Sequence, residues 1–390
     1  MKYTTANPAM KWVMISLLML VTSCSEIPQR ENPVGREHRQ FFDSERVNWN
    51  NTDESRPLGT TIWYPAKPGS IERAWDVGIF KAGRNALNAE RDSQQDKLPL
   101  VVLSHGTGGA AIQLSWLAET LASNGFLVMA VNHHGNTAAE EAYLLQGFML
   151  WWERAQDISS ALDQLLQDPK FGAHVDRTRI GAAGFSIGGY TVLSLAGAIT
   201  DLEQRNAFCT SRPDNAICKP PPEAEFSLKD LELLRDTDPV VKASIARSNR
   251  SYKDERIKAV YSIAPVHGPA LTEDSLANIS IPVRVVVGSK DKQAVPEFNA
   301  EPIVSGIKNS SLNLLSDVAH YTFLAPCSAK GKRFVAELCA DPQGIDRIQT
   351  HQDIGADALE FFSTMLVNSD YDLNQAKVEL SIAIDSFIQL

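Results

Sequence analysis

The sequence predicts an α/β protein with a mostly parallel central sheet flanked by helices, and three observations support this prediction. Short apolar runs alternate with stretches of helical periodicity, which is the pattern of βαβ units. Runs such as Leu98–Leu103 are continuously apolar, as expected for strands buried on both faces. A G-x-S-x-G motif, Gly184–Gly188, stands between an apolar run and a helical segment.

Composition excludes several classes of protein. The chain has 390 residues, of which 44% are hydrophobic, so disordered, collagen-like and small disulfide-scaffold classes do not fit. Its net charge of −10 is spread along the chain without a basic block. Phosphate binding needs a positive stripe, and the sequence therefore predicts no nucleic-acid partner.

The N-terminus has the features of an export signal. Lys2 and Lys11 form a positive segment, Trp12–Val21 is an apolar run, and small residues follow up to Cys24. An apolar run of ten residues cannot span about 30 Å of hydrocarbon, so we expect residues 1–23 to be a signal peptide rather than a transmembrane helix.

The end of this segment, Val21–Cys24, resembles the bacterial lipoprotein signal, in which cleavage precedes the cysteine and the cysteine is acylated. The resemblance implies a palmitate-like lipid on Cys24 and attachment to a membrane of the bacterial cell envelope. Ser25 favours the outer membrane, facing the periplasm or the surface. The alternative is an ordinary secretory signal that leaves Cys24 unmodified.

The rest of the chain divides into a tether and one α/β domain. Residues 24–58 are polar and contain several prolines, so we expect a tether, followed by the domain at 59–390. Charged, helix-prone residues at about 200–255 predict a small helical cap inserted into that domain. The predicted strands are Thr60–Tyr64 at one edge, Leu98–Leu103, Phe126–Val131, Arg179–Phe185, Lys258–Ala264, Val283–Gly288 and Leu312–Leu315.

Residues 137–152 are rich in large apolar side chains. Their density suits a pocket wall or a lid, and it equally suits helical packing in the core. The side chains concerned are Tyr143, Phe148, Trp151 and Trp152.

Ser186 is the candidate nucleophile because it is the central residue of the G-x-S-x-G motif. The glycines allow a sharp turn from strand to helix, which exposes the serine hydroxyl above the N-terminus of the helix. A serine hydroxyl is a poor nucleophile near neutral pH, so it needs a histidine base and a carboxylate that orients the histidine.

His320 and Asp291 are the candidate partners of Ser186. Each follows a predicted strand, and the chain order Ser, Asp, His is that of this kind of sheet. A lone aspartate or histidine is usually solvated or structural, but three residues in this order and context favour a triad. Asp317 is the rival carboxylate, although it precedes the histidine on the same short turn.

The segment Ser104–Gly109 follows a predicted strand and resembles the H-G-x-G segment that supplies an oxyanion donor. Acyl transfer needs backbone donors aimed at the developing oxyanion, and we expect the Thr107 and Ile187 amides to provide them. A plain tight turn and a phosphate loop are the alternatives. The spacing does not match G-x-G-x-x-G or the P-loop.

These motifs together resemble the α/β-hydrolase group around predicted dienelactone hydrolases and platelet-activating-factor acetylhydrolases, over residues 36–366. The resemblance implies an α/β-hydrolase fold. Dienelactone hydrolases use cysteine where this chain has Ser186, and the acetylhydrolases carry a carboxylate where this chain has Ser262–Pro265. The motifs that carry the likeness are Ile62–Ala66, Ser104–Gly109, Val131–Thr137 and Gly184–Gly189.

Five cysteines divide into Cys24 and four others. Four cysteines allow three pairings, and the sequence neighbours Cys209–Cys218 and Cys327–Cys339 are expected to pair because each closes a short loop. An oxidising envelope compartment permits both bonds. Zinc-ligand spacings are missing, so we expect no metal and no cofactor.

The sequence therefore predicts a lipid-anchored serine carboxylester hydrolase that acts through an acyl-enzyme on small or lipid-like esters, with Ser186, His320 and Asp291 as its triad. One alternative is an amidase or peptidase with the same triad. Another is a catalytically silent hydrolase fold that serves as an envelope binding protein. The oligomeric state is not predicted.

Overall fold

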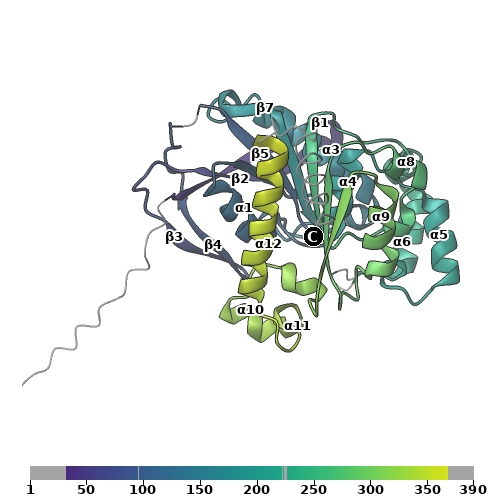
Figure 1. Cartoon of the computed structure of the whole chain (residues 1–390). Coiled ribbons are helices and arrows are strands. Elements are labelled where there is room, and N and C mark those ends of the chain that lie inside the picture. The colour runs from purple at the N-terminus through teal and green to yellow at the C-terminus, as the bar shows by residue number, and fades with distance from the viewer. Residues whose placement is uncertain (1–31, 95, 222, 224–225, 368–390) are drawn as a thin grey trace, which may run out of the picture.

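The computed structural model describes residues 32–94, 96–221, 223 and 226–367 (Figure 1). The predicted signal peptide and Cys24 lie outside these residues. Within them, ten strands form a sheet in the order β10-β9-β8-β7-β5-β6-β2-β1-β4-β3. The strands are β1 Val34–Asn48, β2 Asn51–Pro65, β3 Arg73–Val77, β4 Phe80–Leu87, β5 Leu98–Ser104, β6 Leu127–Val131, β7 Val175–Phe185, β8 Ile257–Ile263, β9 Val283–Gly288 and β10 Ser310–Leu315.

The strands from β5 to β10 form a parallel half-sheet, which confirms the predicted α/β architecture. Every residue of β5 and β6 is buried, as their continuous apolar sequences predicted. Because parallel strands carry helices on both faces, no side chain of such a strand needs to face water.

The N-terminal half of the sheet differs from the prediction. Residues 34–58, expected to belong to a tether, lie in a long antiparallel hairpin of β1 and β2. The predicted strand Thr60–Tyr64 is part of β2, and it is not an edge strand, because β1, β4 and β3 continue the sheet beyond it. The hairpin was missed because β1 carries many charged residues. Some of them are buried with polar partners, as Glu37 is with the Tyr64 hydroxyl.

Helices cover both faces of the sheet (Figure 1). Helices α1 and α12 pack together on one face, and α3 and α4 pack together on the other. The helices are α1 Ser115–Ala122, α2 Leu145–Met149, α3 Arg154–Leu165, α4 Ile187–Ala196, α5 Leu202–Ser211, α6 Leu228–Thr237, α7 Pro239–Ile245, α8 Glu273–Ala277, α9 Ala300–Gly306, α10 Ala329–Phe334, α11 Ala336–Cys339 and α12 Arg347–Phe362. No helix among the described residues is long and apolar enough to cross a membrane.

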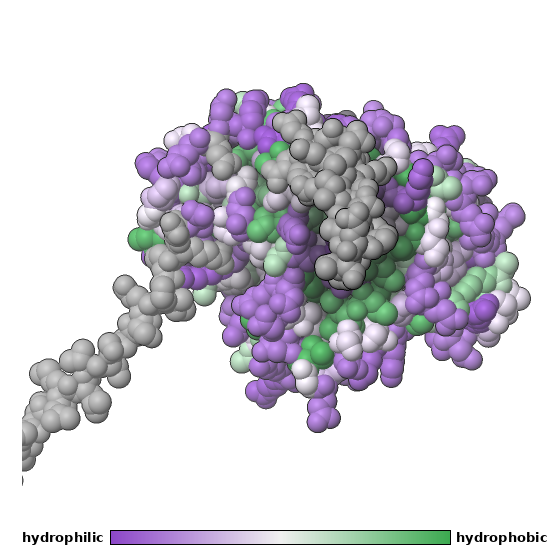
Figure 2. All heavy atoms as spheres, viewed as in Figure 1, coloured by the Kyte–Doolittle hydropathy of each residue, from purple (hydrophilic) through white to green (hydrophobic). Residues whose placement is uncertain are grey.

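The predicted insertion at 200–255 contains α5, α6 and α7, and Figure 1 shows α5 and α6 at the end of the molecule opposite β3 and β4. The Cys209–Cys218 disulfide joins α5 to the short turn that follows it. Hydrophilic side chains cover much of the molecular face drawn in Figure 2. In the cap, helix α5 has no buried residue.

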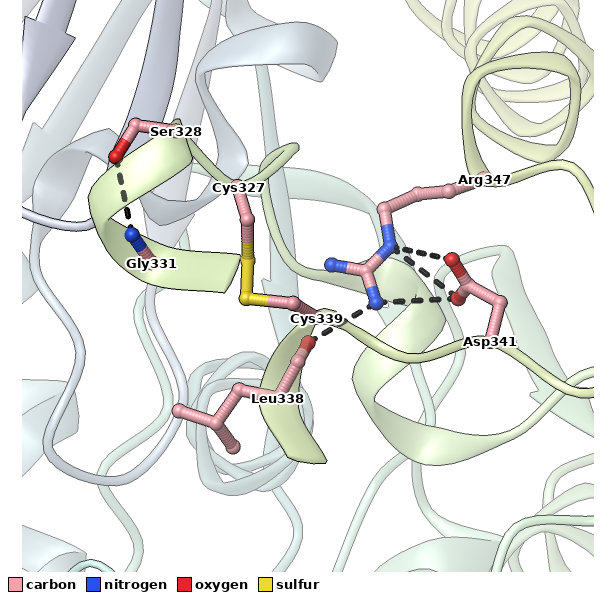
Figure 3. The surroundings of a disulfide bond; sticks show 7 residues. All are labelled: Cys327, Ser328, Gly331, Leu338, Cys339, Asp341 and Arg347. Carbon is pink, nitrogen blue, oxygen red and sulfur yellow. Dashed lines mark hydrogen bonds and ion pairs between the residues drawn. A yellow bond between two sulfur atoms is a disulfide. The ribbon is translucent and has the colours of Figure 1, made fainter. Parts of the chain in front are cut away.

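The second predicted disulfide, Cys327–Cys339, closes the loop that contains α10 and α11 (Figure 3). Arg347 of α12 forms an ion pair with Asp341 and also donates a hydrogen bond to the Leu338 carbonyl. The loop is therefore held both covalently and by the helix beside it.

A cluster of buried charges joins the β1–β2 hairpin to α3. Asp157 of α3 accepts hydrogen bonds from Arg46 of β1 at 2.7 Å and from Arg56 of β2 at 2.8 Å. Burial alone would raise the pKa of Asp157, but the two guanidinium groups and His133 hold that pKa well below its usual value. The hairpin is thus attached to the helix layer by ionised groups.

The substitution Asp157→Asn is expected to lower the free energy of unfolding by about 3–5 kcal/mol, because it removes the carboxylate closest to the buried Arg56 guanidinium and leaves only the more distant Glu153 to balance that charge. Urea denaturation measures this change. The matched control is Asp163→Asn on the same helix, where an exposed carboxylate pairs with Arg256 and contributes less than about 1 kcal/mol. Equal losses in the two variants would contradict a structural role for the buried cluster.

Candidate active site

Ser186 occupies the sharp turn between β7 and α4 that the motif predicted. Its backbone has φ 58° and ψ −119°, a conformation rarely adopted by non-glycine residues. A Cβ atom on Gly184 would lie 2.2 Å from the Gly188 carbonyl oxygen, and one on Gly188 would lie 2.0 Å from the Ser104 carbonyl oxygen. Both motif glycines are therefore required by close backbone contacts.

The three predicted triad residues form one hydrogen-bonded chain. His320 Nε2 lies 3.0 Å from Ser186 Oγ, and His320 Nδ1 lies 2.7 Å from Asp291 Oδ2. Asp291 Oδ1 accepts the backbone N–H groups of Gln293 and Ala294, which fixes the carboxylate. An ionised carboxylate only accepts hydrogen bonds, so Nδ1 carries the proton and Nε2 accepts from the serine hydroxyl.

Asp317, the rival carboxylate, points away from this chain of hydrogen bonds. It is exposed and forms an ion pair with Lys290 at 2.7 Å. Asp291, by contrast, is 4% exposed and directly follows β9 through a short turn. The structure thus brings His320 together with Asp291 and not with Asp317.

The loop after β5 lies beside the serine turn. The backbone N–H of Gly106 donates to Gln113 and that of Gly108 donates to Asn136, so side chains on both sides fix the loop. The Thr107 and Ile187 backbone N–H groups have no acceptor among the described residues. Both residues line the same cavity as Ser186, as expected for oxyanion donors.

Buried polar groups support this loop from below, and the sequence did not reveal them. Arg154 of α3 donates to the His105 carbonyl. His105 Nε2 accepts the His133 backbone N–H, so the ring is neutral and Nδ1 donates to the Gly106 carbonyl. Burial, followed by the charge of Arg154, holds the pKa of His105 well below its usual value. Only the folded chain brings Arg154 to this loop.

The cavity over Ser186 has a volume of about 1340 Å³, larger than the roughly 300–1,000 Å³ of common small-molecule sites. The aromatic residues of 137–152 line it, as expected for a pocket wall, and Trp151 and Trp152 also belong to the buried core, so the two interpretations both hold for them. The cap also contributes lining residues. Lining residues include Tyr143, Phe148, Trp151 and Trp152 from the aromatic segment, and Leu202, Arg205, Ile217, Leu231 and Ile245 from the cap.

The remaining histidines near strand ends differ in position. His267 lines the cavity and stacks on Trp151, with ring centroids 4.4 Å apart. His133 is buried between Asp157 and Ser104, and His134 hydrogen-bonds to Glu140, so these two are structural. The described part of the chain contains no group of three or more His, Cys, Asp or Glu residues able to hold a metal.

The protein has the α/β-hydrolase fold. Part of the chain, residues 73–150, matches the family model described as platelet-activating factor acetylhydrolase, isoform II. Residues 112–202 match the prolyl oligopeptidase family model. Together with the fold, these matches support the α/β-hydrolase superfamily that the sequence motifs predicted.

The similar curated proteins are named cutinases, and a solved structure with a similar fold is named a ferulic acid esterase. Cutinase est1 of Thermobifida alba is 28% identical over 159 residues, which cover 39% of this chain and 49% of that protein. Cutinase 2 of Thermobifida cellulosilytica is 30% identical over 159 residues, covering 39% and 56%. The chain thus spans about half the length of these curated relatives. A solved ferulic acid esterase from Streptomyces cinnamoneus shares the fold, with a TM-score of 0.55 and 20% identity over 87% of this chain and 92% of that one.

The substitution Asp291→Asn is expected to slow the labelling of Ser186 by a fluorophosphonate at least about 100-fold, because the histidine loses the acceptor that fixes its tautomer. Mass spectrometry of the labelled protein measures the rate. The control Asp317→Asn exchanges the same groups outside the triad and should leave the rate unchanged. A larger loss in the control would transfer the assignment to Asp317.

Proposed function

We propose that this protein is a serine carboxylester hydrolase with Ser186, His320 and Asp291 as its triad. The observation that carries the proposal is the hydrogen-bonded chain from Asp291 through His320 to Ser186, which opens into a large, mainly apolar cavity. The esterase names among the relatives support the same reaction class.

The geometry suits an acyl-enzyme mechanism. His320 takes the Ser186 proton as Oγ attacks the ester carbonyl, and Asp291 stabilises the imidazolium that forms. The Thr107 and Ile187 amides bind the oxyanion of the tetrahedral intermediate. His320 then protonates the leaving alcohol, and a water molecule, activated by the same histidine, hydrolyses the acyl-enzyme.

The substrates we propose are small or lipid-like esters. Tyr143, Phe148, Trp151 and Trp152 offer an apolar wall for an acyl or aromatic group, and the cavity accommodates more than a short acyl chain. An amidase or peptidase activity is a second candidate, favoured by the prolyl oligopeptidase family match over residues 112–202. A panel of matched esters and amides separates the two.

We also propose that a lipid on Cys24 attaches the protein to a membrane of the bacterial cell envelope, with the outer membrane favoured. The motif Val21–Cys24 supports this proposal. The described domain begins a short distance further along the chain, at β1.

Replacing Ser186 by alanine tests the activity. Hydrolysis of a short-chain nitrophenyl ester is expected to fall by roughly a factor of 10³ or more, because the nucleophile is lost while the oxyanion donors remain. Initial rates give the change, and circular dichroism verifies that the variant is folded. Full activity of the variant would refute the triad, and a wild-type protein that takes no fluorophosphonate label would favour the silent binding protein.

Replacing Cys24 by alanine tests the anchor. The expected result is a shift of the protein from the membrane fraction to the soluble fraction, since two or more buried acyl chains are needed for stable attachment and none can then be added. Fractionation and immunoblotting measure the distribution. A control with Cys209 and Cys218 both replaced by serine should stay in the membrane fraction. An unchanged distribution of the Cys24 variant would favour the ordinary secretory signal.

A further inference from the structure

Arg205, on the cap helix α5, lies in the wall of the cavity that contains Ser186. Its guanidinium carbon is 5.3 Å from the centroid of the Trp151 ring. Trp151 stacks on His267, and the neighbouring Val266 donates its backbone N–H to the Ser186 carbonyl at 3.4 Å. Arg205 is therefore separated from the serine turn by two stacked rings.

The charge of Arg205 is not compensated within the described part of the chain. One N–H, on Nη2, donates to the Ile217 carbonyl at 2.6 Å. Nε is buried without a partner, and no described carboxylate forms an ion pair with the side chain. Burial lowers the pKa of this guanidinium, but an arginine stays charged in proteins. A half-buried cation without a counter-ion is costly, which is why such groups are usually paired.

The other basic residues that line the cavity, among those described, are already paired. Arg235 forms an ion pair with Asp236, and Lys219 forms one with Asp214. Asp201, the carboxylate nearest in sequence to Arg205, caps the backbone N–H groups of α5. Among the described arginine and lysine residues that line the cavity, Arg205 is thus the one whose charge no described carboxylate balances.

Two features fix the position of this guanidinium. The Cys209–Cys218 disulfide closes the segment between α5 and the turn that contains Ile217, whose carbonyl holds Arg205. The Trp151 ring limits the guanidinium on another side. A planar guanidinium held in this way presents its remaining donors in the fork geometry that binds carboxylates.

We propose that Arg205 binds a carboxylate of the substrate, so that the preferred esters combine an apolar or aromatic body with a negatively charged group. This inference rests on the proposed ester hydrolysis and names the substrate class for the same site. Arg205 acts in specificity and does not touch the reacting atoms. The aromatic wall holds the apolar body of the ester while the guanidinium selects the anionic end.

Paired esters that differ only in charge test the proposal. One series consists of 4-nitrophenyl monoesters of linear dicarboxylic acids of increasing length, whose free carboxylate lies on the acyl side, and of the same compounds with that carboxylate methylated. A second pair, 4-acetoxybenzoate and its methyl ester, carries the charge on the alcohol side. For at least one pair, Arg205→Gln should lower kcat/KM for the anionic ester by roughly 10- to 100-fold, because a hydrogen bond to a charged group contributes about that much to binding. The neutral ester should change little.

Controls separate charge recognition from folding. Arg212→Gln removes the same charge from an exposed position of the cap that does not line the cavity, and it should leave the ratio of the two kcat/KM values unchanged. Arg205→Lys keeps the charge without the fork and should give an intermediate ratio. Thermal unfolding of each variant reports any loss of the contact with Ile217.

Binding measured without catalysis distinguishes failure of this inference from failure of the proposed function. In Ser186→Ala protein, calorimetry should show that 4-acetoxybenzoate or a dicarboxylate monoester binds more tightly than its methyl ester, and Arg205→Gln added to this variant should abolish the difference. If this charge-dependent binding is observed but the wild-type protein hydrolyses no ester, the proposed function is overturned and the inference about Arg205 is not. Hydrolysis with a charge preference that does not depend on Arg205, or with none, would overturn the inference alone.

Discussion

The candidate site depends on a glycine at position 188, because a side chain there would not fit between the serine turn and the end of β5. The Gly188 backbone packs so closely on the Ser104 carbonyl that a Cβ atom would lie 2.0 Å from its oxygen. This contact fixes the distance between the strand that leads to Thr107 and the helix that begins at Ile187. Thr107 and Ile187 line one cavity together with Ser186, whose backbone conformation is strained.

Buried charges extend this constraint to the N-terminal part of the sheet. Asp157 holds Arg46 and Arg56 of the hairpin, while Arg154, on the same helix, holds the His105 carbonyl. One helix therefore connects the hairpin to the loop that follows β5. Breaking such a network costs far more than a surface ion pair because the remaining charges cannot reach water.

Two of the segments that line the cavity are cross-linked where their own packing is thin. The cap helix α5 buries none of its residues, and its disulfide holds the turn at Ile217 against Arg205. The Cys327–Cys339 loop follows the turn that carries His320, and Leu338 within it reaches the cavity. A disulfide that closes a short loop lowers the entropy of the unfolded chain. It therefore stabilises a segment that lines a cavity and buries few of its own side chains.

Local sequence determined the parallel strands, the serine turn and both disulfide pairs, because each depends on nearby residues: continuous apolar runs, glycines beside the serine, and cysteines a short loop apart. Only the tertiary structure decided that residues 34–58 extend the sheet, since their charged side chains find partners far along the chain and hide the alternation of a strand. The sequence favoured Asp291 over Asp317 as the partner of His320, and the structure places the side chains of Asp291 and His320 2.7 Å apart. Only the tertiary structure brings Arg154 to the loop after β5 and Arg205 to the cavity wall. Those positions depend on contacts between residues distant in sequence, and no local pattern encodes them.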